Sequence, residues 1–279
     1  MTLNKIYVDK VIDNALLEDI HYMDAATDSL IPENQAGSAV FIAKAEGILC
    51  GIDIALRVFR RLDDQIVSEI YKYDGDAVQK GEIIAKISGS AKCILKGERT
   101  ALNLLQHLSG IATETNSFVK LVEGTKASIS DTRKTLPGLR ALQKYAVKTG
   151  SGKNHRFNLS DAAMIKDNHI DASGGIKKAI TIVKEKLGHM IKIEVEVRTI
   201  DELAEALSAG ADVILLDNMS LEAMKEAVKL TAGRAVLEAS GNITKATVKE
   251  TAETGVDIIS VGALTHTVKS LDISLKWNG

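Results

Sequence analysis

Residues 192–218, KIEVEVRTIDELAEALSAGADVILLDN, contain one copy of a unit that recurs along the second half of the chain. A short apolar run at 192–197 is followed by a stretch in which apolar or small residues recur at i, i+3, i+4 and i+7 from Leu203. That spacing places them on one face of a helix. A second apolar run follows at 212–218. The pattern predicts a strand, a helix and another strand.

The same unit recurs on both sides of this stretch. Further apolar runs are AAMIKDN (162–168), AVLEASG (235–241) and DIISVGA (257–263), and an earlier strand is expected at 127–131. Apolar strands that alternate with helices every ~20–30 residues are typical of a parallel sheet covered on both faces. We expect an α/β barrel, with a doubly wound open sheet as the alternative. Neither GxGxxG nor GxxxxGKS/T occurs, so the open sheet lacks its usual nucleotide-binding loops.

The first hundred residues follow a different pattern. The segment around Leu17 looks helical, whereas ILCGIDIALRVF (48–59) and EIYKYDGDAVQKGEIIAKISG (69–89) look like short strands broken by glycine turns. A helix that begins near Thr100 is expected to join the two halves, because its apolar residues share one face. The chain therefore combines two architectures.

Composition excludes several classes of protein. The chain has 279 residues, 45% of them hydrophobic and 26% charged, and 35 basic residues against 37 acidic ones leave a net charge of −2. These values indicate a soluble globular protein and disfavour a nucleic-acid coating protein. Cys50 and Cys93 form no CxxC pair, no apolar run approaches a bilayer span, and the first ten residues lack a signal peptide's apolar core. We expect a cytoplasmic protein with neither membrane nor nucleic acid as partner.

Charged and small residues follow the predicted strands. In a parallel barrel the carboxyl ends of the strands open onto one face, which carries the site. Each of these residues alone could simply begin a solvated loop, but together they would form a ring at one mouth. The ring consists of Asp131, Arg133, Lys166, Glu196, Asp217, Ser240 with Gly241, and Gly262.

Residues 131–170 carry eight basic and three acidic side chains, although the whole chain is slightly acidic. Pro137 is suited to open a helix and Gly150 to close one. Basic residues spaced four apart within that helix are expected to form an exposed, solvated stripe, made of Arg140, Lys144 and Lys148.

The other cations of this segment are harder to explain as solvated charges. Arg133 and Lys134 follow a predicted strand, and His155 and Arg156 lie in a glycine-flanked loop. Lys166 ends an apolar run, where burial of an unpaired ammonium group would be costly. An anionic ligand would offset that cost, and guanidinium groups match carboxylates and phosphates. We expect a substrate with several negative charges.

Two carboxylates and two glycine turns complete the predicted site. Glu196 and Asp217 end successive strands, where they could form structural salt bridges or hold Mg²⁺ through water. The loop 239–242 precedes a helix expected at 244–254, and its N–H groups could cradle a phosphate. The turn 261–263 could do the same. The sequence contains no GxSxG motif, and neither cysteine is accompanied by a base. A covalent nucleophile is therefore not indicated.

Six segments, in order along nearly the whole chain, closely resemble the quinolinate phosphoribosyltransferase family. The combination of DTRKT with KDNHI is highly specific. The resemblance implies an N-terminal α/β sandwich domain over 1–110 and an incomplete, TIM-like α/β barrel over 111–267, with the tail 268–279 packing on the first domain. The segments are ERTALNLLQHLSGIAT (98–113), DTRKTLPGLRALQKYAVKTGSGKNHR (131–156), LSDAAMIKDNHI (159–170), IEVEV (193–197), LLDN (215–218) and EASGNIT (238–244).

The activity that the resemblance implies is that of a pentosyltransferase in NAD biosynthesis. Such an enzyme converts quinolinate and phosphoribosyl pyrophosphate to nicotinate mononucleotide, pyrophosphate and CO₂, with Mg²⁺ as cofactor. Family members assemble as homodimers or hexamers of dimers, so Arg99 would reach the site of a neighbouring subunit. By similarity, the quinolinate pocket would be lined by Thr132, Arg133, Lys134, His155, Arg156 and Lys166.

The remaining site residues are also assigned by similarity. Lys134, Glu196 and Asp217 would be catalytic, and the two acids would face the ribose and the Mg²⁺–pyrophosphate group. The 5′-phosphate would be held by Ser240, Gly241, Asn242, Gly262 and Ala263.

The sequence departs from the family pattern at Ser151, Asn158 and Asn242, where glycine is frequent. Asparagine tolerates a left-handed backbone better than most residues, so Asn158 and Asn242 are expected to keep the loop shapes. Three alternatives remain: a paralogue associated with molybdenum transport, a non-catalytic binder of phosphorylated metabolites, and a nicotinate-specific phosphoribosyltransferase. The intact cations disfavour the first and third, and Glu196 with Asp217 disfavours the second.

Overall fold

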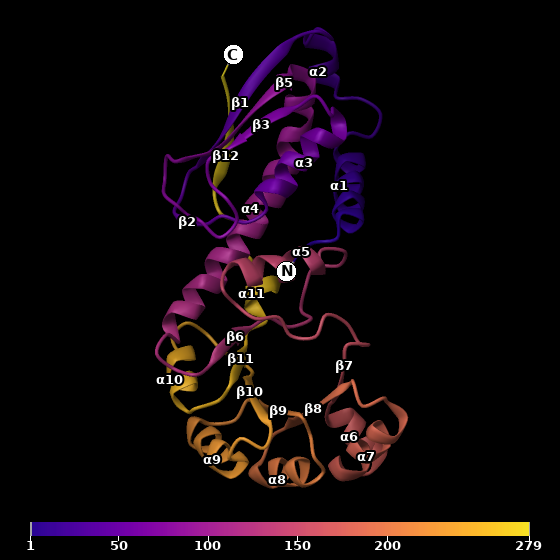
Figure 1. Cartoon of the computed structure of the whole chain (residues 1–279), viewed down its shortest axis with the longest axis vertical. Coiled ribbons are helices and arrows are strands. Elements are labelled where there is room, and N and C mark those ends of the chain that lie inside the picture. The colour runs from indigo at the N-terminus through magenta and orange to yellow at the C-terminus, as the bar shows by residue number, and fades with distance from the viewer. Residues whose placement is uncertain (1, 279) are drawn as a thin grey trace. The chain divides into compact units, whose positions relative to one another are not determined.

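A computed structural model describes residues 2–278 of the chain (Figure 1). Met1 and Gly279, which begin and end the predicted domain ranges, lie outside the described residues. The chain divides into two compact units. One comprises Met1–Asn116, Thr135–Ser151 and Leu264–Gly279, and the other comprises Ser117–Lys134 and Gly152–Ala263. A bilayer-spanning helix is not found among residues 2–278, because none of their helices combines sufficient length with sufficient hydropathy.

The first unit is built on an antiparallel sheet with the strand order β12-β1-β5-β3. Its strands are β12 (Ile273–Trp277), β1 (Ala36–Ala43), β5 (Ile83–Ser90) and β3 (Val67–Ile70), and a separate pair is β2 (Gly47–Ile48) with β4 (Ala77–Val78). Strand β12 comes from the end of the chain and pairs with β1 from Ala39 to Ala43. The C-terminal residues therefore contribute an edge strand to this sheet.

Six helices belong wholly or mostly to this unit among the described residues: α1 (Lys5–Asp19), α2 (Ala25–Leu30), α3 (Ile52–Leu62), α4 (Ala91–Leu121), α5 (Arg140–Thr149) and α11 (Ala263–His266). Phe41 of β1 and Phe59 of α3 pack edge to face with centroids 6.1 Å apart, and both are fully buried. Helix α4 runs without a break through residue 110, where the resemblance places a domain boundary. That boundary stays a prediction.

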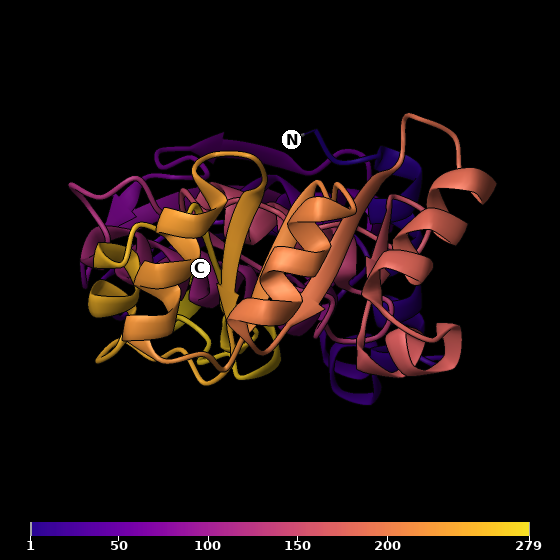
Figure 2. The same cartoon turned by 90° about the horizontal axis from the view of Figure 1, so that it is seen from below.

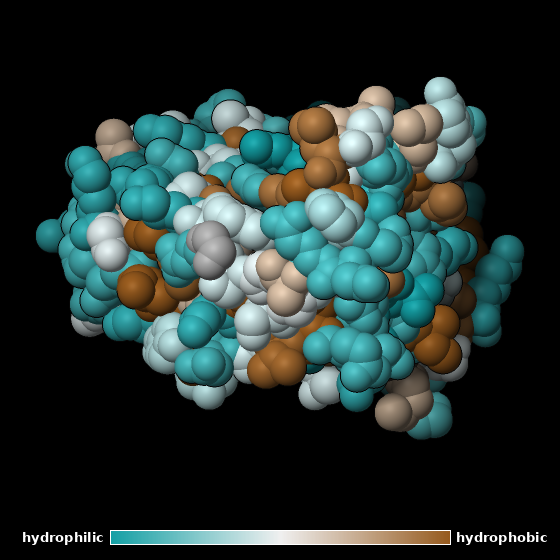
Figure 3. Space-filling view, turned by 90° about the horizontal axis from the view of Figure 1, so that it is seen from above, coloured by the Kyte–Doolittle hydropathy of each residue, from teal (hydrophilic) through white to brown (hydrophobic). Residues whose placement is uncertain are grey.

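The surface seen in Figure 3 is mostly hydrophilic, with patches of apolar side chains between the polar ones.

The strand predicted within residues 48–59 is wrong, because Ile52–Leu62 forms helix α3. The carboxylate of Asp74 accepts hydrogen bonds from the N–H groups of Gly51 and Ile52, at 2.8 and 3.0 Å, and so caps the helix. Gly51 has a left-handed backbone with φ of 97° that starts the helix sharply. The cap lies more than twenty residues away along the chain, so the local apolar pattern did not reveal it.

The second unit contains six parallel strands in the order β6-β11-β10-β9-β8-β7, which confirms the predicted incomplete barrel. Among the described residues β6 and β7 are the two edges and do not pair with each other. Each strand lies within an apolar run predicted from the sequence. The strands are β6 (Ser128–Ser130), β7 (Ala162–Ile165), β8 (Lys192–Val197), β9 (Val213–Asp217), β10 (Val236–Ser240) and β11 (Ile258–Ser260).

Helices follow the strands of this sheet, and Figures 1 and 2 show α7, α8 and α9 side by side along one of its faces. Because side chains alternate along a strand, Ile193, Val195 and Val197 of β8 form a buried apolar row. Glu194 and Glu196 lie on the opposite face. The helices are α6 (Asp167–Ser173), α7 (Ile176–Lys186), α8 (Ile200–Ser208), α9 (Leu221–Thr231) and α10 (Val248–Glu253).

Candidate active site

The predicted acidic residues stand at the carboxyl ends of adjacent strands. Glu196 lies near the end of β8, Asp217 ends the neighbouring β9, and Ser240 ends β10 opposite Asp217 in the ladder. Lys166 follows β7 directly, and Gly262 lies shortly after β11. Since all six strands run parallel, these residues lie at the side of the sheet where the strands terminate, which we call the carboxyl edge.

Lys166 is less buried than the sequence suggested. Its side chain is 50% exposed, and its Nζ lies 3.2 Å from Oε2 of Glu196, which is only 14% exposed. The expectation of a costly buried ammonium group is therefore wrong: Lys166 follows an edge strand, where its side chain reaches solvent, and it has a carboxylate partner.

A second ion pair lies at the same edge and was missed by the sequence analysis. Nη2 of Arg198 lies 2.5 Å from Oδ2 of Asp167, and the charges of Glu196 and Asp217 also raise the pKa of Arg198. Arg198 follows β8 immediately, in the same way that Lys166 follows β7. A basic residue directly after a predicted strand was the signal that could have found it.

The loop that follows α5 is anchored by Asp131, which is fully buried just after β6. Its Oδ1 accepts the backbone N–H of His155 and its Oδ2 accepts Nδ2 of Asn154, both at 2.8 Å. Lys153 of this loop also forms a parallel bridge with Ser130. The loop is thereby held along the edge strand β6.

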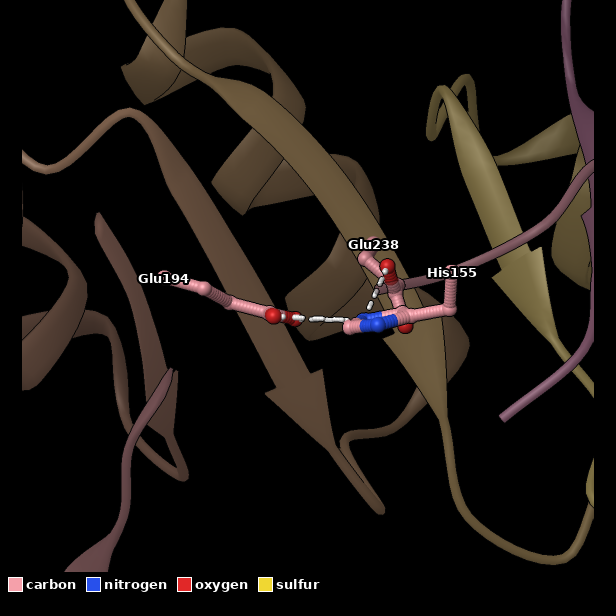
Figure 4. A group of neighbouring side chains, drawn as sticks. All are labelled: His155, Glu194 and Glu238. Atoms are coloured by element: carbon pink, nitrogen blue, oxygen red, sulfur yellow. Dashed lines mark hydrogen bonds and ion pairs between the residues drawn. The ribbon is translucent and has the colours of Figure 1, made fainter. Parts of the chain in front are cut away.

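His155 points from this loop between two buried glutamates, as Figure 4 shows. Its Nε2 lies 3.1 Å from Glu194 and 3.5 Å from Glu238, and its Nδ1 accepts the backbone N–H of Arg156 at 2.8 Å. The resemblance placed only His155 in the site. The signal for the two glutamates was present, because each lies inside a predicted strand: Glu194 alternates with apolar residues in β8, and Glu238 lies between Leu237 and Ala239 in β10.

Burial and the neighbouring charge of Glu194 raise the pKa of Glu238 from 4.5 to about 7, although His155 and a hydrogen bond from Ser260 oppose the shift. Asp131 adds a smaller repulsion. Oε1 of Glu238 has no hydrogen-bond partner in the described structure. Ionising both buried carboxylates would place two negative charges next to each other. Glu238 therefore holds its proton more tightly than a glutamate in water does.

Replacing Glu238 with glutamine should flatten the pH dependence of stability. The folded protein holds the Glu238 proton more tightly than the unfolded chain, so the stability it contributes is complete below about pH 4.5 and is lost as the pH rises through about 7. Glutamine does not titrate. In urea unfolding, the free energy of unfolding should fall between pH 5 and pH 8 by ~3 kcal/mol less in the variant than in the wild type.

The exposed Glu226→Gln is the matched control for that measurement, because it removes a carboxylate of α9 that is open to water. Its unfolding free energies should follow the wild type at both pH values. Equal pH dependence in Glu238→Gln and the wild type would contradict the prediction.

Two predicted substrate-binding cations lie near each other. The guanidinium group of Arg156 donates to the Ala162 carbonyl at 2.8 Å and contacts Sδ of Met164 at 3.6 Å, both on β7. Burial lowers its pKa, and the positive charge of Arg133 lowers it further. Arg133 and Lys134 are exposed, and the Lys134 N–H donates to Thr132 Oγ1 at 3.0 Å. The arrangement concentrates positive charge beside β6 and β7.

The loop after β10 is shaped by glycine and asparagine. Gly241 has φ of 100°, and a Cβ there would lie 2.3 Å from Oδ1 of Asn218, so only glycine fits. Asn242 adopts the expected left-handed backbone, with φ of 51°. Asn218, which the site prediction omitted, donates to Asp217 and accepts from Asn242, both at 3.0 Å. The LLDN sequence carried that signal.

The helix predicted at 244–254 is shorter than expected, because α10 begins only at Val248. The N–H of Thr244 donates to Oγ1 of Thr247 at 3.0 Å, which makes a separate turn before the helix. The loop after β10 is therefore not directly joined to a helix N-terminus. The residues predicted to hold the phosphate are thus left with the N–H groups of this loop and of Gly262 and Ala263, which follow β11.

Further expectations concern α5, the loop that follows it, and Arg99. The helix ends at Gly150 as predicted, but Lys144 is only 1% exposed, so the solvated stripe is wrong at that position. The period of four could not reveal that Lys144 packs inward while Lys148 stays exposed. Ser151 is left-handed with φ of 71°, whereas Asn158 is not among the left-handed residues. Arg99 is exposed on α4, in the first unit.

Comparison with known proteins gives consistent matches. Residues 24–109 match the family described as the N-terminal domain of quinolinate phosphoribosyl transferase, and residues 111–276 match the C-terminal domain. A probable nicotinate-nucleotide pyrophosphorylase (carboxylating) of Bacillus subtilis is 46% identical over 273 residues, which cover 98% of this chain and 94% of that protein. Another, from Methanocaldococcus jannaschii, is 44% identical over 280 residues and covers 97% of each. The crystal structure of NadC from Streptococcus pyogenes has a TM-score of 0.97 at 40% identity, with 100% of both chains covered.

Proposed function

The chain belongs to the quinolinate phosphoribosyltransferase family, and we propose that the carboxyl edge of its parallel sheet is the active site. The enzyme converts quinolinate and phosphoribosyl pyrophosphate to nicotinate mononucleotide, pyrophosphate and CO₂ in NAD biosynthesis. One observation carries the assignment of the site. Lys166 and Glu196 form an ion pair at the carboxyl edge, Asp217 ends the adjacent strand, and Arg156 lies within the electrostatic influence of Arg133.

Quinolinate is a pyridine dicarboxylate, and its proposed pocket centres on Arg133 and Arg156. Two neighbouring guanidinium groups repel each other, and a dianion between them removes that repulsion. Lys166 is half exposed and pairs with Glu196, so it is free to exchange that partner for a substrate carboxylate. The remaining proposed pocket residues are Thr132, Lys134 and His155.

Glu196 and Asp217 are the proposed residues for the ribose and for Mg²⁺. Their side chains fit the ion, because carboxylate oxygens on adjacent strands are the ligands Mg²⁺ prefers, usually through water. When bound, Mg²⁺ neutralises charge on the departing pyrophosphate. Arg198 lies in the field of both carboxylates and adds a cation at that end of the site.

The 5′-phosphate is assigned to the two turns after β10 and β11. Gly241 and Asn242 expose backbone N–H groups in left-handed conformations, and such successive amides make concavities that bind anions. Hydrogen bonds tie Asn242 to Asn218 and Asn218 to Asp217, so the phosphate loop and the ribose-facing carboxylate are joined. The full set is Ser240, Gly241, Asn242, Gly262 and Ala263.

The reaction requires no side-chain nucleophile. The pyridine nitrogen attacks the anomeric carbon as pyrophosphate departs, and Glu196 and Asp217 stabilise the positive charge that develops on the ribose. The new pyridinium nitrogen then stabilises the carbanion left when the adjacent carboxylate is lost as CO₂, and this carbon takes a proton from water to give nicotinate mononucleotide. Lys134 is assigned to the departing pyrophosphate and the substrate carboxylates. Positioning and electrostatics supply most of the rate.

The exposed apolar side chains and the cysteines bear on assembly and location. Tyr22, Ile6 and Leu30 of the first unit are 85%, 80% and 76% exposed, and such apolar side chains are suited to contact between subunits. A homodimer, or a hexamer of dimers, would let the exposed Arg99 of one subunit reach the site of its neighbour. Cys50 and Cys93 are both unpaired and buried, in keeping with a cytoplasmic enzyme.

The site is tested by following labelled CO₂ released from carboxyl-labelled quinolinate. Arg133→Ala should raise the KM for quinolinate by about tenfold or more, because a charge-assisted hydrogen bond to one carboxylate is lost. The KM for phosphoribosyl pyrophosphate should stay within about twofold of the wild type. The exposed Lys225→Ala on α9 is the control. An unchanged quinolinate KM would remove Arg133 from the pocket, and turnover of nicotinate in place of quinolinate would indicate a monoacid substrate.

A further inference from the structure

A buried network surrounds His155, and the chemistry above assigns no function to the two glutamates that contact its ring. The side chains of His155, Glu194 and Glu238 are 13%, 5% and 5% exposed, and they come from a loop and from strands β8 and β10 (Figure 4). Their nitrogen and oxygen atoms lie within 4.8 Å of one another. Groups at this spacing can hold a metal ion or share a proton, and the hydrogen bonds of the ring distinguish the two.

The proton of the imidazole is placed by Arg156. The backbone N–H of Arg156 donates to Nδ1 at 2.8 Å, so Nδ1 carries a lone pair and no proton. A neutral imidazole has one N–H, which must then lie on Nε2. Nε2 faces Glu194 at 3.1 Å and Glu238 at 3.5 Å. A metal ligand would need a lone pair on Nε2, so this geometry favours the shared proton over a metal ion.

The His155 ring also fixes the position of the Arg156 backbone. The backbone N–H of His155 donates to the buried Asp131, and its ring Nε2–H lies between the two glutamates, so the residue is held at both ends. Its Nδ1 then holds the N–H of Arg156. From this fixed backbone the guanidinium group reaches Ala162 and Met164 on β7. The glutamates thus act on Arg156 through a single intervening residue.

We propose that Glu194 and Glu238 are positioning residues that hold the Nε2–H form of His155 and thereby orient Arg156 toward the substrate carboxylates. This inference rests on the proposed function of Arg156 in the quinolinate pocket. The glutamates touch neither substrate in this arrangement. Their effect is on the affinity for the dicarboxylate, and the ribose-facing carboxylates act independently of them.

Glu194→Gln is the sharpest test. The new amide can donate to Nε2, which favours the ring form with its proton on Nδ1, and that form cannot accept from Arg156. The KM for quinolinate should rise about tenfold, while kcat stays within about threefold. The KM for phosphoribosyl pyrophosphate should not change. Glu194→Asp, which keeps the acceptor, should recover most of the quinolinate affinity, and Glu226→Gln should match the wild type.

Nitrogen NMR of the histidine ring measures the mechanism directly. In the wild type at pH 7 the His155 signals, assigned with a His155→Asn variant, should show the proton on Nε2, and in Glu194→Gln they should show it on Nδ1. A doubly protonated ring or a proton on Nδ1 in the wild type would overturn the proposal. So would an unchanged ring form in Glu194→Gln combined with an unchanged quinolinate KM.

Arg156→Ala separates this inference from the assignment of the pocket. If that variant leaves the quinolinate KM unchanged, the proposed pocket is wrong and the positioning function fails with it. If Arg156→Ala raises the quinolinate KM but Glu194→Gln does not, the pocket stands and only the positioning proposal is overturned. A rise in both variants, with the ring proton moved in Glu194→Gln, supports the proposal.

Discussion

Asp217→Asn is expected to lower kcat by about a hundredfold, with little change in stability. The side chain ends β9 at the carboxyl edge. In the proposed site its negative charge would face the positive charge that develops on the ribose. Asparagine keeps the size of the side chain, and its amide oxygen can still accept the hydrogen bond that Asn218 donates at 3.0 Å. Only the charge is removed, so the effect falls on the transition state.

Steady-state kinetics with a Mg²⁺ titration measures this effect. Chelation should abolish turnover by the wild type, and Asp217→Asn should need more Mg²⁺ for half-maximal activity, because one of the two proposed carboxylates is gone. Asp201→Asn, on the exposed first turn of α8, is the matched control. If Asp217→Asn keeps the wild-type kcat and the wild-type Mg²⁺ requirement, the carboxylate has neither function.

Asp131→Ala is expected to lower the free energy of unfolding by roughly 3–5 kcal/mol. The carboxylate is fully buried and accepts hydrogen bonds from His155 and Asn154, both at 2.8 Å. Alanine leaves these donors without their acceptor inside the protein. Because the loop that carries Arg156 is anchored by the same bonds, the KM for quinolinate should rise as well.

Urea unfolding and quinolinate kinetics of the same preparation test both effects. Asp161→Ala is the control from the neighbouring part of the chain, because Asp161 also accepts a backbone N–H, from Phe157 at 2.6 Å, but is exposed. Water can replace that bond, so the cost should be about 1 kcal/mol or less. Equal costs at Asp131 and Asp161 would show that the buried anchor contributes no more than an exposed one.

The barrel could be predicted because the residues that specify each strand and helix lie close together in the sequence. In residues 192–218 the strand, the helix and the next strand each bury one row of apolar side chains, and the spacing of those rows is visible in the sequence. The direction of the strands then placed Glu196 and Asp217 at one edge. The motif resemblance supplied the substrate, which spacing alone does not identify.

The errors share a physical cause, which is dependence on distant partners. Helix α3 is capped by Asp74, more than twenty residues further along the chain, and its apolar residues could equally have formed a strand. Lys144 keeps helical spacing with Arg140 and Lys148 but faces inward, because burial depends on what packs against the helix. Helix α10 starts late because Thr244 and Thr247 bond to each other first.

Local periodicity and motif chemistry therefore accounted for the strands, the acidic edge and the cations of this enzyme. The partners of His155 depended on the folded chain, since the imidazole meets Glu194 39 residues away along the sequence and Glu238 on another strand still. A glutamate within an apolar strand is visible in the sequence, but which group it faces is not. Only the folded chain brings β8, β10 and the loop after α5 together around one ring nitrogen, and in the proposed arrangement that juxtaposition holds the Nε2–H form of His155 and orients Arg156.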